Sequence, residues 1–281
     1  MRLRSWLISV AAVPSAVLAQ GGRGSGPLQG ATQLDLAGKT AEARVAIQSV
    51  IDTSSQPAGK AAAQRAMAMS YAFDGDCANT VKYETLVIDY WRTREPVEPQ
   101  NAFYQEGEMA NEAARVCIDA GVFDVAEQWY RKGTELGMKE PAPQTHPKSL
   151  WDYRLAHALG RLAARRGDKA EAQKQVVNAR RILDSDSTMR AAQERFYPYL
   201  VGYVALYTND LPSAEREFVK MVDVTGNQAD PFMRYLLGLT YEKEGRAADA
   251  KAAYEKAWSL ATAHNPPAAF VRRMLRRQMG Q

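Results

Sequence analysis

The sequence is poor in the residues that most often carry out chemistry at an active site. Its 281 residues include only three histidines and two cysteines. His146, His157 and His264 are far apart along the chain, and no thiol or carboxylate cluster accompanies them at the spacing of a metal site. We therefore expect no metal centre, no cofactor and no histidine-based catalysis.

Runs that alternate apolar and polar residues are also scarce, which argues against exposed β-sheets. Apolar residues make up 46% of the chain, and alanine is abundant, so a sizeable helical core is expected. No serine nucleophile motif is present. The glycine-rich stretch 21–26 follows no strand, which makes it a flexible linker and not a phosphate-binding loop. The composition predicts an all-α protein.

The first residues have the pattern of an export signal. Arg2 and Arg4 precede an apolar stretch over 6–18, and Val17, Leu18 and Ala19 form a small-residue cleavage pattern. The stretch is shorter than the roughly 20 residues that span a bilayer. We expect a signal peptide over 1–19, a linker over 20–27, and a mature chain that is periplasmic or secreted.

Positive charge is concentrated at the carboxyl end. The formal net charge is +4, and 272–277 alone contains four arginines, so the rest of the mature chain is slightly acidic. Such a distribution does not favour nucleic acid as a partner. Over 266–281 we expect a basic capping helix, because Phe270 and Met274 share one helical face and the arginines occupy the others. Contact of this tail with a membrane surface is the alternative.

One pattern of small and aromatic residues recurs along the chain. Near the carboxyl end it consists of Gly238, Tyr241, Gly245, Ala250, Tyr254 and Ala257. In six units, a small residue is followed seven positions later by glycine or asparagine: Ala31 and Gly38, Ala68 and Gly75, Ala114 and Gly121, Gly160 and Gly167, Gly202 and Asn209, Gly238 and Gly245. This order resembles the tetratricopeptide repeat (TPR). The resemblance implies a right-handed superhelical solenoid of about six helix-turn-helix repeats over 28–265, followed by the capping helix.

The chemistry of each unit follows from these residue types. A small residue on the first helix lets the second helix approach, and glycine or asparagine accepts the left-handed conformation that ends a helix. Asp76, Asp168 and Asp210 follow the turn as N-cap candidates for the second helix. The second unit departs from the pattern, with Thr80 and Glu84 where an alanine and an aromatic residue are expected.

The repeat arrangement also predicts how the cysteines lie. Cys77 would begin the second helix of one unit, and Cys117 would lie late in the first helix of the next unit. Antiparallel neighbours bring these two positions together, and an exported protein is expected to pair them as a disulfide. Two buried free thiols are the alternative.

In the TPR family the first helices line a concave groove that binds peptides. Here the groove would carry a basic stripe beside an aromatic one, from the residues Asn111, Arg115, Arg154, His157, Arg161, Arg165, Tyr199, Tyr203 and Tyr207. Arginine suits carboxylates and tyrosine offers contact area, so an acidic peptide or a chain terminus is the expected partner. Alternatively, the charges only solvate a helical face and the tyrosines complete the core. The family's lysine and asparagine carboxylate clamp is not reproduced.

These features favour a protein-binding adaptor or scaffold of the cell envelope over an enzyme. The alternative function is an enzyme, or an enzyme subunit, that acts on cell-wall glycan and uses the repeats as a substrate platform. Two buried carboxylates converging in a closed pocket would favour the enzyme, whereas an open groove without such a pair would favour the adaptor.

Overall fold

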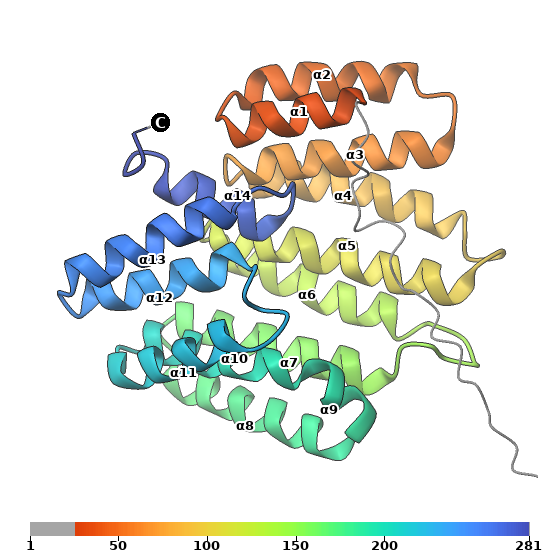
Figure 1. Ribbon diagram of the computed structural model, residues 1–281. Helices are drawn as coiled ribbons and strands as arrows, with labels where there is room; N and C mark the ends of the chain where they lie inside the picture. The colour runs from red at the N-terminus through yellow and green to blue at the C-terminus, as the bar shows by residue number, and fades with distance from the viewer. Residues whose placement is uncertain (1–25, 281) are drawn as a thin grey trace, which may run out of the picture.

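The computed structural model describes residues 26–280, so the predicted signal peptide and most of the predicted linker lie outside the described residues. Within this range the protein is all-α, and no strand occurs among the described residues. Consecutive helices form antiparallel hairpins that follow one another along an arc (Figure 1). The hairpins are α1 (Pro27–Leu36) with α2 (Thr40–Thr53), α3 (Pro57–Ala72) with α4 (Cys77–Arg92), α5 (Pro99–Asp119) with α6 (Phe123–Gly137), α7 (Lys148–Arg165) with α8 (Lys169–Ser185), α10 (Tyr197–Tyr207) with α11 (Leu211–Asp223), and α12 (Pro231–Lys243) with α13 (Ala247–Leu260).

Three further elements interrupt or end this series. The short helix α9 (Ser187–Gln193) and the 3-10 helix η1 (Glu194–Phe196) connect α8 to α10. The last helix, α14 (Pro266–Leu275), covers most of the segment expected to form a capping helix. No helix in the described part of the chain combines the length and the apolar character that crossing a membrane requires.

The turns within the hairpins adopt the conformation expected from the sequence. The predicted glycines and the asparagine all have positive φ, from +67° at Asn209 to +82° at Gly38 and Gly121. Asp76, Asp168 and Asp210 each accept a hydrogen bond from the backbone N–H three residues later, so the N-cap prediction is confirmed.

Glycine also allows close packing within the hairpins. A Cβ atom on Gly202 would lie 2.6 Å from the ring of Phe218, and a Cβ on Gly238 would lie 2.6 Å from the ring of Tyr254. Any larger residue at either position would separate the paired helices. The second hairpin keeps the same packing with different residues, because Thr80 and Glu84 are both fully buried on a regular α4.

A disulfide joins the second and third hairpins. Cys77 is the first residue of α4, and Cys117 lies near the end of α5. Their sulfur atoms are 2.03 Å apart and their Cα atoms are 4.7 Å apart, which confirms the predicted pairing.

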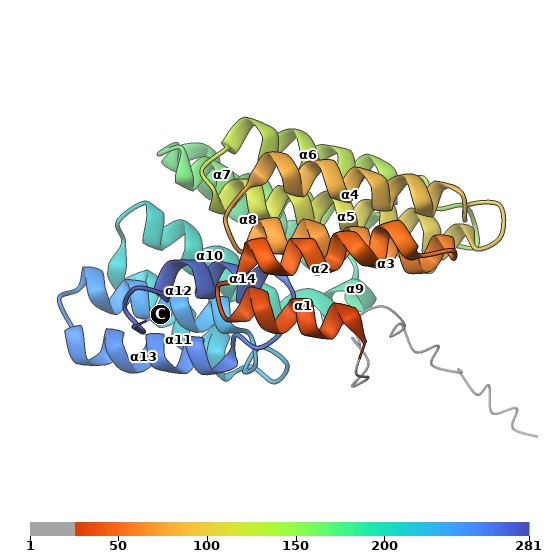
Figure 2. The ribbon, with the colours of Figure 1, turned by 90° about the horizontal axis from the view of Figure 1, so that it is seen from above.

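The position of α14 differs from that of a simple terminal cap. It packs on α12 and α13, as a cap would, but it also contacts α3 and α5 (Figures 1 and 2). Phe270, Val271 and Leu275 are almost completely buried in these contacts. The arginines of the segment are therefore not simply solvated: Arg273 forms an ion pair with Asp119 of α5, and Arg276 donates a hydrogen bond to the carbonyl of Gly38.

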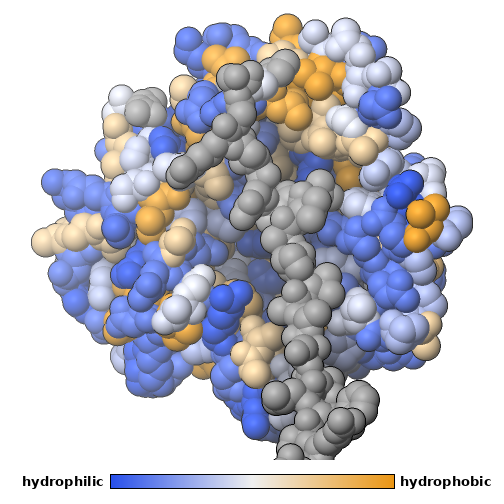
Figure 3. All heavy atoms as spheres, turned by 45° about the vertical axis from the view of Figure 1, so that its right-hand side comes forward, coloured by the Kyte–Doolittle hydropathy of each residue, from blue (hydrophilic) through white to orange (hydrophobic). Residues whose placement is uncertain are grey.

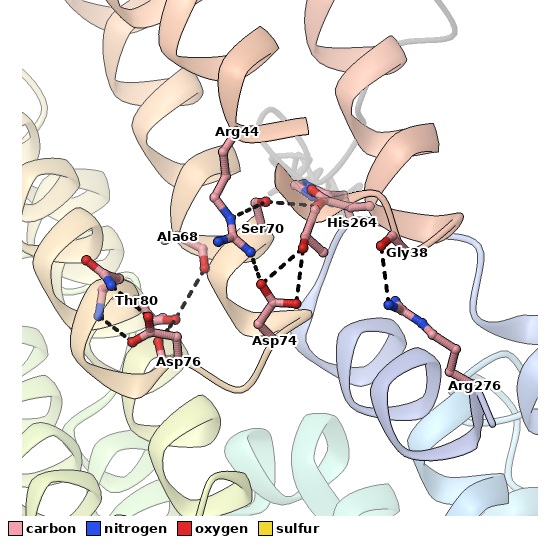
Figure 4. A network of polar contacts seen from close by, with 12 residues as sticks. Gly38, Arg44, Ala68, Ser70, Asp74, Asp76, Thr80, His264 and Arg276 are labelled. Atoms are coloured by element: carbon pink, nitrogen blue, oxygen red, sulfur yellow. Dashed lines mark hydrogen bonds and ion pairs between the residues drawn. The ribbon is translucent and has the colours of Figure 1, made fainter. Parts of the chain in front are cut away.

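A polar network secures the junction between the two ends of the arc (Figure 4). His264 Nε2 lies 2.8 Å from a carboxylate oxygen of the buried Asp35, although the two residues are 229 positions apart. The other oxygen of Asp35 accepts a hydrogen bond of 2.8 Å from Ser70, which in turn receives one of 3.3 Å from Arg44. Arg44 also pairs with Asp74. The carboxyl-terminal segment thus ties the last hairpin to the first two.

Figure 3 presents one face of the molecule, and the part of it that grey residues do not cover shows no large apolar area. Hydrophilic atoms predominate there, and apolar atoms form separate small groups. The large apolar side chains that are exposed in the described part of the chain are scattered over different helices and turns: Val45, Leu86, Val97, Val122, Val177 and Val219. Single exposed apolar residues of this kind are ordinary for a folded protein.

Candidate functional site

Most of the predicted groove residues come together between α7 and α10. We call His157, Arg161, Arg165, Tyr199, Tyr203 and Tyr207 the arginine–tyrosine cluster. The residues of α7 recur every four positions, so they lie on one face of that helix. The tyrosines also recur every four positions, on α10, the helix that packs against it. Successive tyrosine rings touch, with centroids 5.9 Å and 4.6 Å apart.

Arg161 lies at the centre of the cluster and is only 7% exposed. Its guanidinium donates hydrogen bonds of 3.2 Å to the hydroxyl of Tyr199 and 3.1 Å to the hydroxyl of Tyr130. A third bond, of 3.3 Å, goes to the backbone carbonyl of His157. All three acceptors are electrically neutral. Tyr130, on α6, was not among the predicted site residues, because only the packing of α6 against the cluster brings it there.

Arg165 repeats this arrangement one turn later. It donates a hydrogen bond of 3.1 Å to the hydroxyl of Tyr203, and its guanidinium lies 4.9 Å from the ring centroid of Tyr207. This is the geometry of a cation–π contact. Burial raises the pKa of the Tyr203 and Tyr199 hydroxyls, so both phenols keep their protons at neutral pH.

The histidine of the cluster does not carry charge at neutral pH. His157 is buried, and its Nε2 lies 3.2 Å from the carbonyl oxygen of Phe196. Burial, together with the positive charge of Arg161, lowers the pKa of His157 well below its usual range. The positive charge of the cluster therefore resides on its arginines.

The remaining predicted residues have different surroundings. Arg115 of α5 is half-buried and lines a cavity with Arg161, whereas Arg154 pairs with Glu108 and lies 4.9 Å from the ring of Trp151. Asn111 packs close to the backbone of Gly133 on α6. The structure thus brings Arg115 to the cluster and places Asn111 and Arg154 outside it.

A small cavity of about 10 Å³ lies beside the cluster, between α5, α7, α10, α12 and α14. Its lining consists of Arg115, Ile118, Asp119, Arg161, Tyr199, Tyr203, Phe232 and Phe270. A wider hollow of about 730 Å³ lies over η1 and the loop that follows α11, and no predicted site residue lines it. The small cavity is therefore the one that belongs to the candidate site.

Asp119 is the acidic residue of this cavity. Its side chain is only 4% exposed and pairs with Arg273 of α14. Burial raises the pKa of Asp119, and Arg273 opposes that effect by stabilising the carboxylate. The pairing could not be read from the repeat pattern, because it joins residues 154 positions apart.

Two buried carboxylates approach each other elsewhere, on α4 and α5. Glu84 is fully buried, and burial together with Glu112 raises its pKa well above the usual range. Glu112 accepts a hydrogen bond of 2.8 Å from Arg65. Neither residue lines the two cavities described above. A buried acidic pair therefore exists, and it lies away from the two cavities described above.

Glu106 of α5 is a buried acid that should make the stability of the protein depend on pH. The residue is 1% exposed, and burial together with the neighbouring Glu95 raises its pKa to about 7. The folded protein thus holds this proton more tightly than the unfolded chain does. Protonated Glu106 therefore contributes to the free energy of unfolding below the ordinary pKa of glutamate, and this contribution is lost as the pH rises through about 7.

We expect Glu106→Gln to raise the free energy of unfolding by roughly 2 to 3 kcal/mol at pH 8, because glutamine needs no proton to be neutral. At pH 5 the variant and the parent should agree within about 1 kcal/mol. Urea unfolding at both pH values measures the difference. Glu255→Gln, at an exposed position, is the matched control and should show no such pH dependence. Equal effects of Glu106→Gln at both pH values would contradict the raised pKa of Glu106.

No group of three or more histidine, cysteine, aspartate or glutamate side chains is placed to hold a metal ion within residues 26–280. What the cluster offers is fixed positive charge, phenol hydroxyls and aromatic surface.

No model of a known protein family matches the chain, and no curated protein matches it either.

Proposed function

We propose that this protein is a binding scaffold of the cell envelope, exported through the signal at 1–19. In this proposal the hairpins form a right-handed superhelical solenoid of about six TPR-like repeats. Support comes from the left-handed glycine or asparagine at the same place in each hairpin, and from the packing of neighbouring hairpins along the chain.

The partner in this proposal is an acidic protein segment or a chain terminus, bound against the first helices of the central hairpins. The observation that carries the proposal is the arginine–tyrosine cluster, in which α7 and α10 hold cations and aromatic rings side by side. Arg115, which is half-buried and lines the cavity beside the cluster, adds to the positive charge there. Arginine pairs with carboxylates through two parallel hydrogen bonds, and tyrosine adds contact area at low entropic cost.

Site-specific crosslinking in the producing cell tests this proposal. A photo-reactive phenylalanine derivative replaces Tyr199, a half-buried tyrosine of the cluster, and in a matched control it replaces Tyr90, a half-buried tyrosine on α4. We expect protein adducts from position 199 and none from position 90. The adducts should disappear when Arg115→Glu is added, because the acidic partner would then be repelled. Adducts that form equally at both positions, or that survive Arg115→Glu, would refute binding at the cluster.

A further inference from the structure

The charges around the small cavity do not balance. Arg115 and Arg161 line it, and Arg165 and Arg273 adjoin it through Tyr203 and Asp119. An arginine keeps its charge at any pH at which proteins fold. Against these four cations, the carboxylates that these groups face within the described residues are those of Asp119 and Asp230.

Neither carboxylate is available to Arg161. Asp119 pairs with Arg273, and Asp230 caps α12 by accepting the backbone N–H groups of Phe232 and Met233. Residues 1–25, outside the described part, contain no acidic side chain that could supply the missing charge. A buried charge needs a partner of opposite sign or a dense set of hydrogen bonds, and the three neutral acceptors of Arg161 leave its charge uncompensated.

The hydroxyl group of Tyr199, a residue that lines the cavity, is able to donate a hydrogen bond. Tyr199 accepts a hydrogen bond from Arg161, and Tyr203 accepts one from Arg165. A phenol that accepts from a guanidinium still has its own proton to donate. The hydroxyl proton of Tyr199 is therefore free to point toward an anion beside Arg115 and Arg161. The cavity of about 10 Å³ has room for one occupant of about the size of a water molecule.

We propose that this cavity binds a small monatomic anion, chloride, between Arg115 and Arg161. The ion compensates the buried charge and joins α5 and α7 to the tyrosines of α10. Because Phe270 of α14 closes the same cavity, the bound anion also stabilises the docking of the carboxyl-terminal helix. The site does not depend on the proposed partner, since it can be tested on the purified protein alone.

Urea unfolding of the purified full chain at constant ionic strength tests the proposal, with gluconate replaced stepwise by chloride. Gluconate is too large for the cavity. Because the anion binds only the folded state, each tenfold rise of chloride above its dissociation constant should raise the folding equilibrium constant about tenfold. A stability that is independent of chloride would overturn the proposal.

The variant Arg115→Gln tests whether the chloride dependence of stability arises at this cavity. This side chain is half-buried and forms no hydrogen bond or ion pair among the described residues, so its replacement breaks no polar contact of the fold. The chloride dependence should disappear in this variant and persist in Arg181→Gln, which removes an exposed arginine bonded only to Asn178. Crystals of the parent grown with bromide should show an anomalous peak between Arg115 and Arg161. An unchanged chloride dependence in Arg115→Gln, or the absence of this peak, would refute the site.

Discussion

Replacing Phe270 by alanine is expected to lower the free energy of unfolding by about 3 to 5 kcal/mol, because the ring leaves an empty space in a closed core. Phe270 is 2% exposed, and its ring packs edge-on against Phe232 of α12 with centroids 5.2 Å apart. The same ring closes the cavity beside the arginine–tyrosine cluster. Loss of the ring therefore weakens the packing of α14 on α3 and α5. It also weakens the packing of α14 on the last hairpin, α12 and α13.

Urea unfolding measures this loss, and limited proteolysis shows where it acts. Phe103→Ala, which truncates a half-buried phenylalanine of α5, is the matched control and should cost clearly less. In Phe270→Ala the segment after α13 should be cleaved faster than in the parent, because α14 separates from α3 and α5 more often. A loss below about 1 kcal/mol with unchanged cleavage would mean that α14 does not hold the ends of the arc together.

Local features of the hairpins could be predicted from the sequence. The left-handed positions and the N-cap aspartates depend on residues a few positions apart, so glycine, asparagine and aspartate reveal them directly. The pairing of Cys77 with Cys117 could also be predicted, because it requires only that consecutive helices pack as antiparallel neighbours. The spacing of four residues placed Arg161 and Arg165 on one helical face, with the tyrosine stripe of the next unit beside them.

Contacts between distant parts of the chain could not be predicted in this way. Nothing local to His264 or Asp35 indicates that they meet, and the same holds for Arg273 and Asp119. These contacts arise because the arc of hairpins brings its two ends close enough for α14 to reach α3 and α5. Asn111 and Arg154 show a related limit: their helical stripe was predictable, but packing against α6 and against Trp151 directs them away from the cluster.

The disulfide should contribute about 4 kcal/mol to stability, because it closes a loop of 40 residues in the unfolded chain. The double variant Cys77→Ala with Cys117→Ala is expected to unfold at a correspondingly lower urea concentration. Reductant should lower the stability of the parent to a similar value and leave the double variant unchanged, which separates the covalent bond from the packing of the two side chains. Since the bond ties α4 to α5, and α5 carries Arg115 and Asp119, its loss should also weaken the docking of α14. A parent that is equally stable with and without reductant would show that helix packing alone fixes the position of α5.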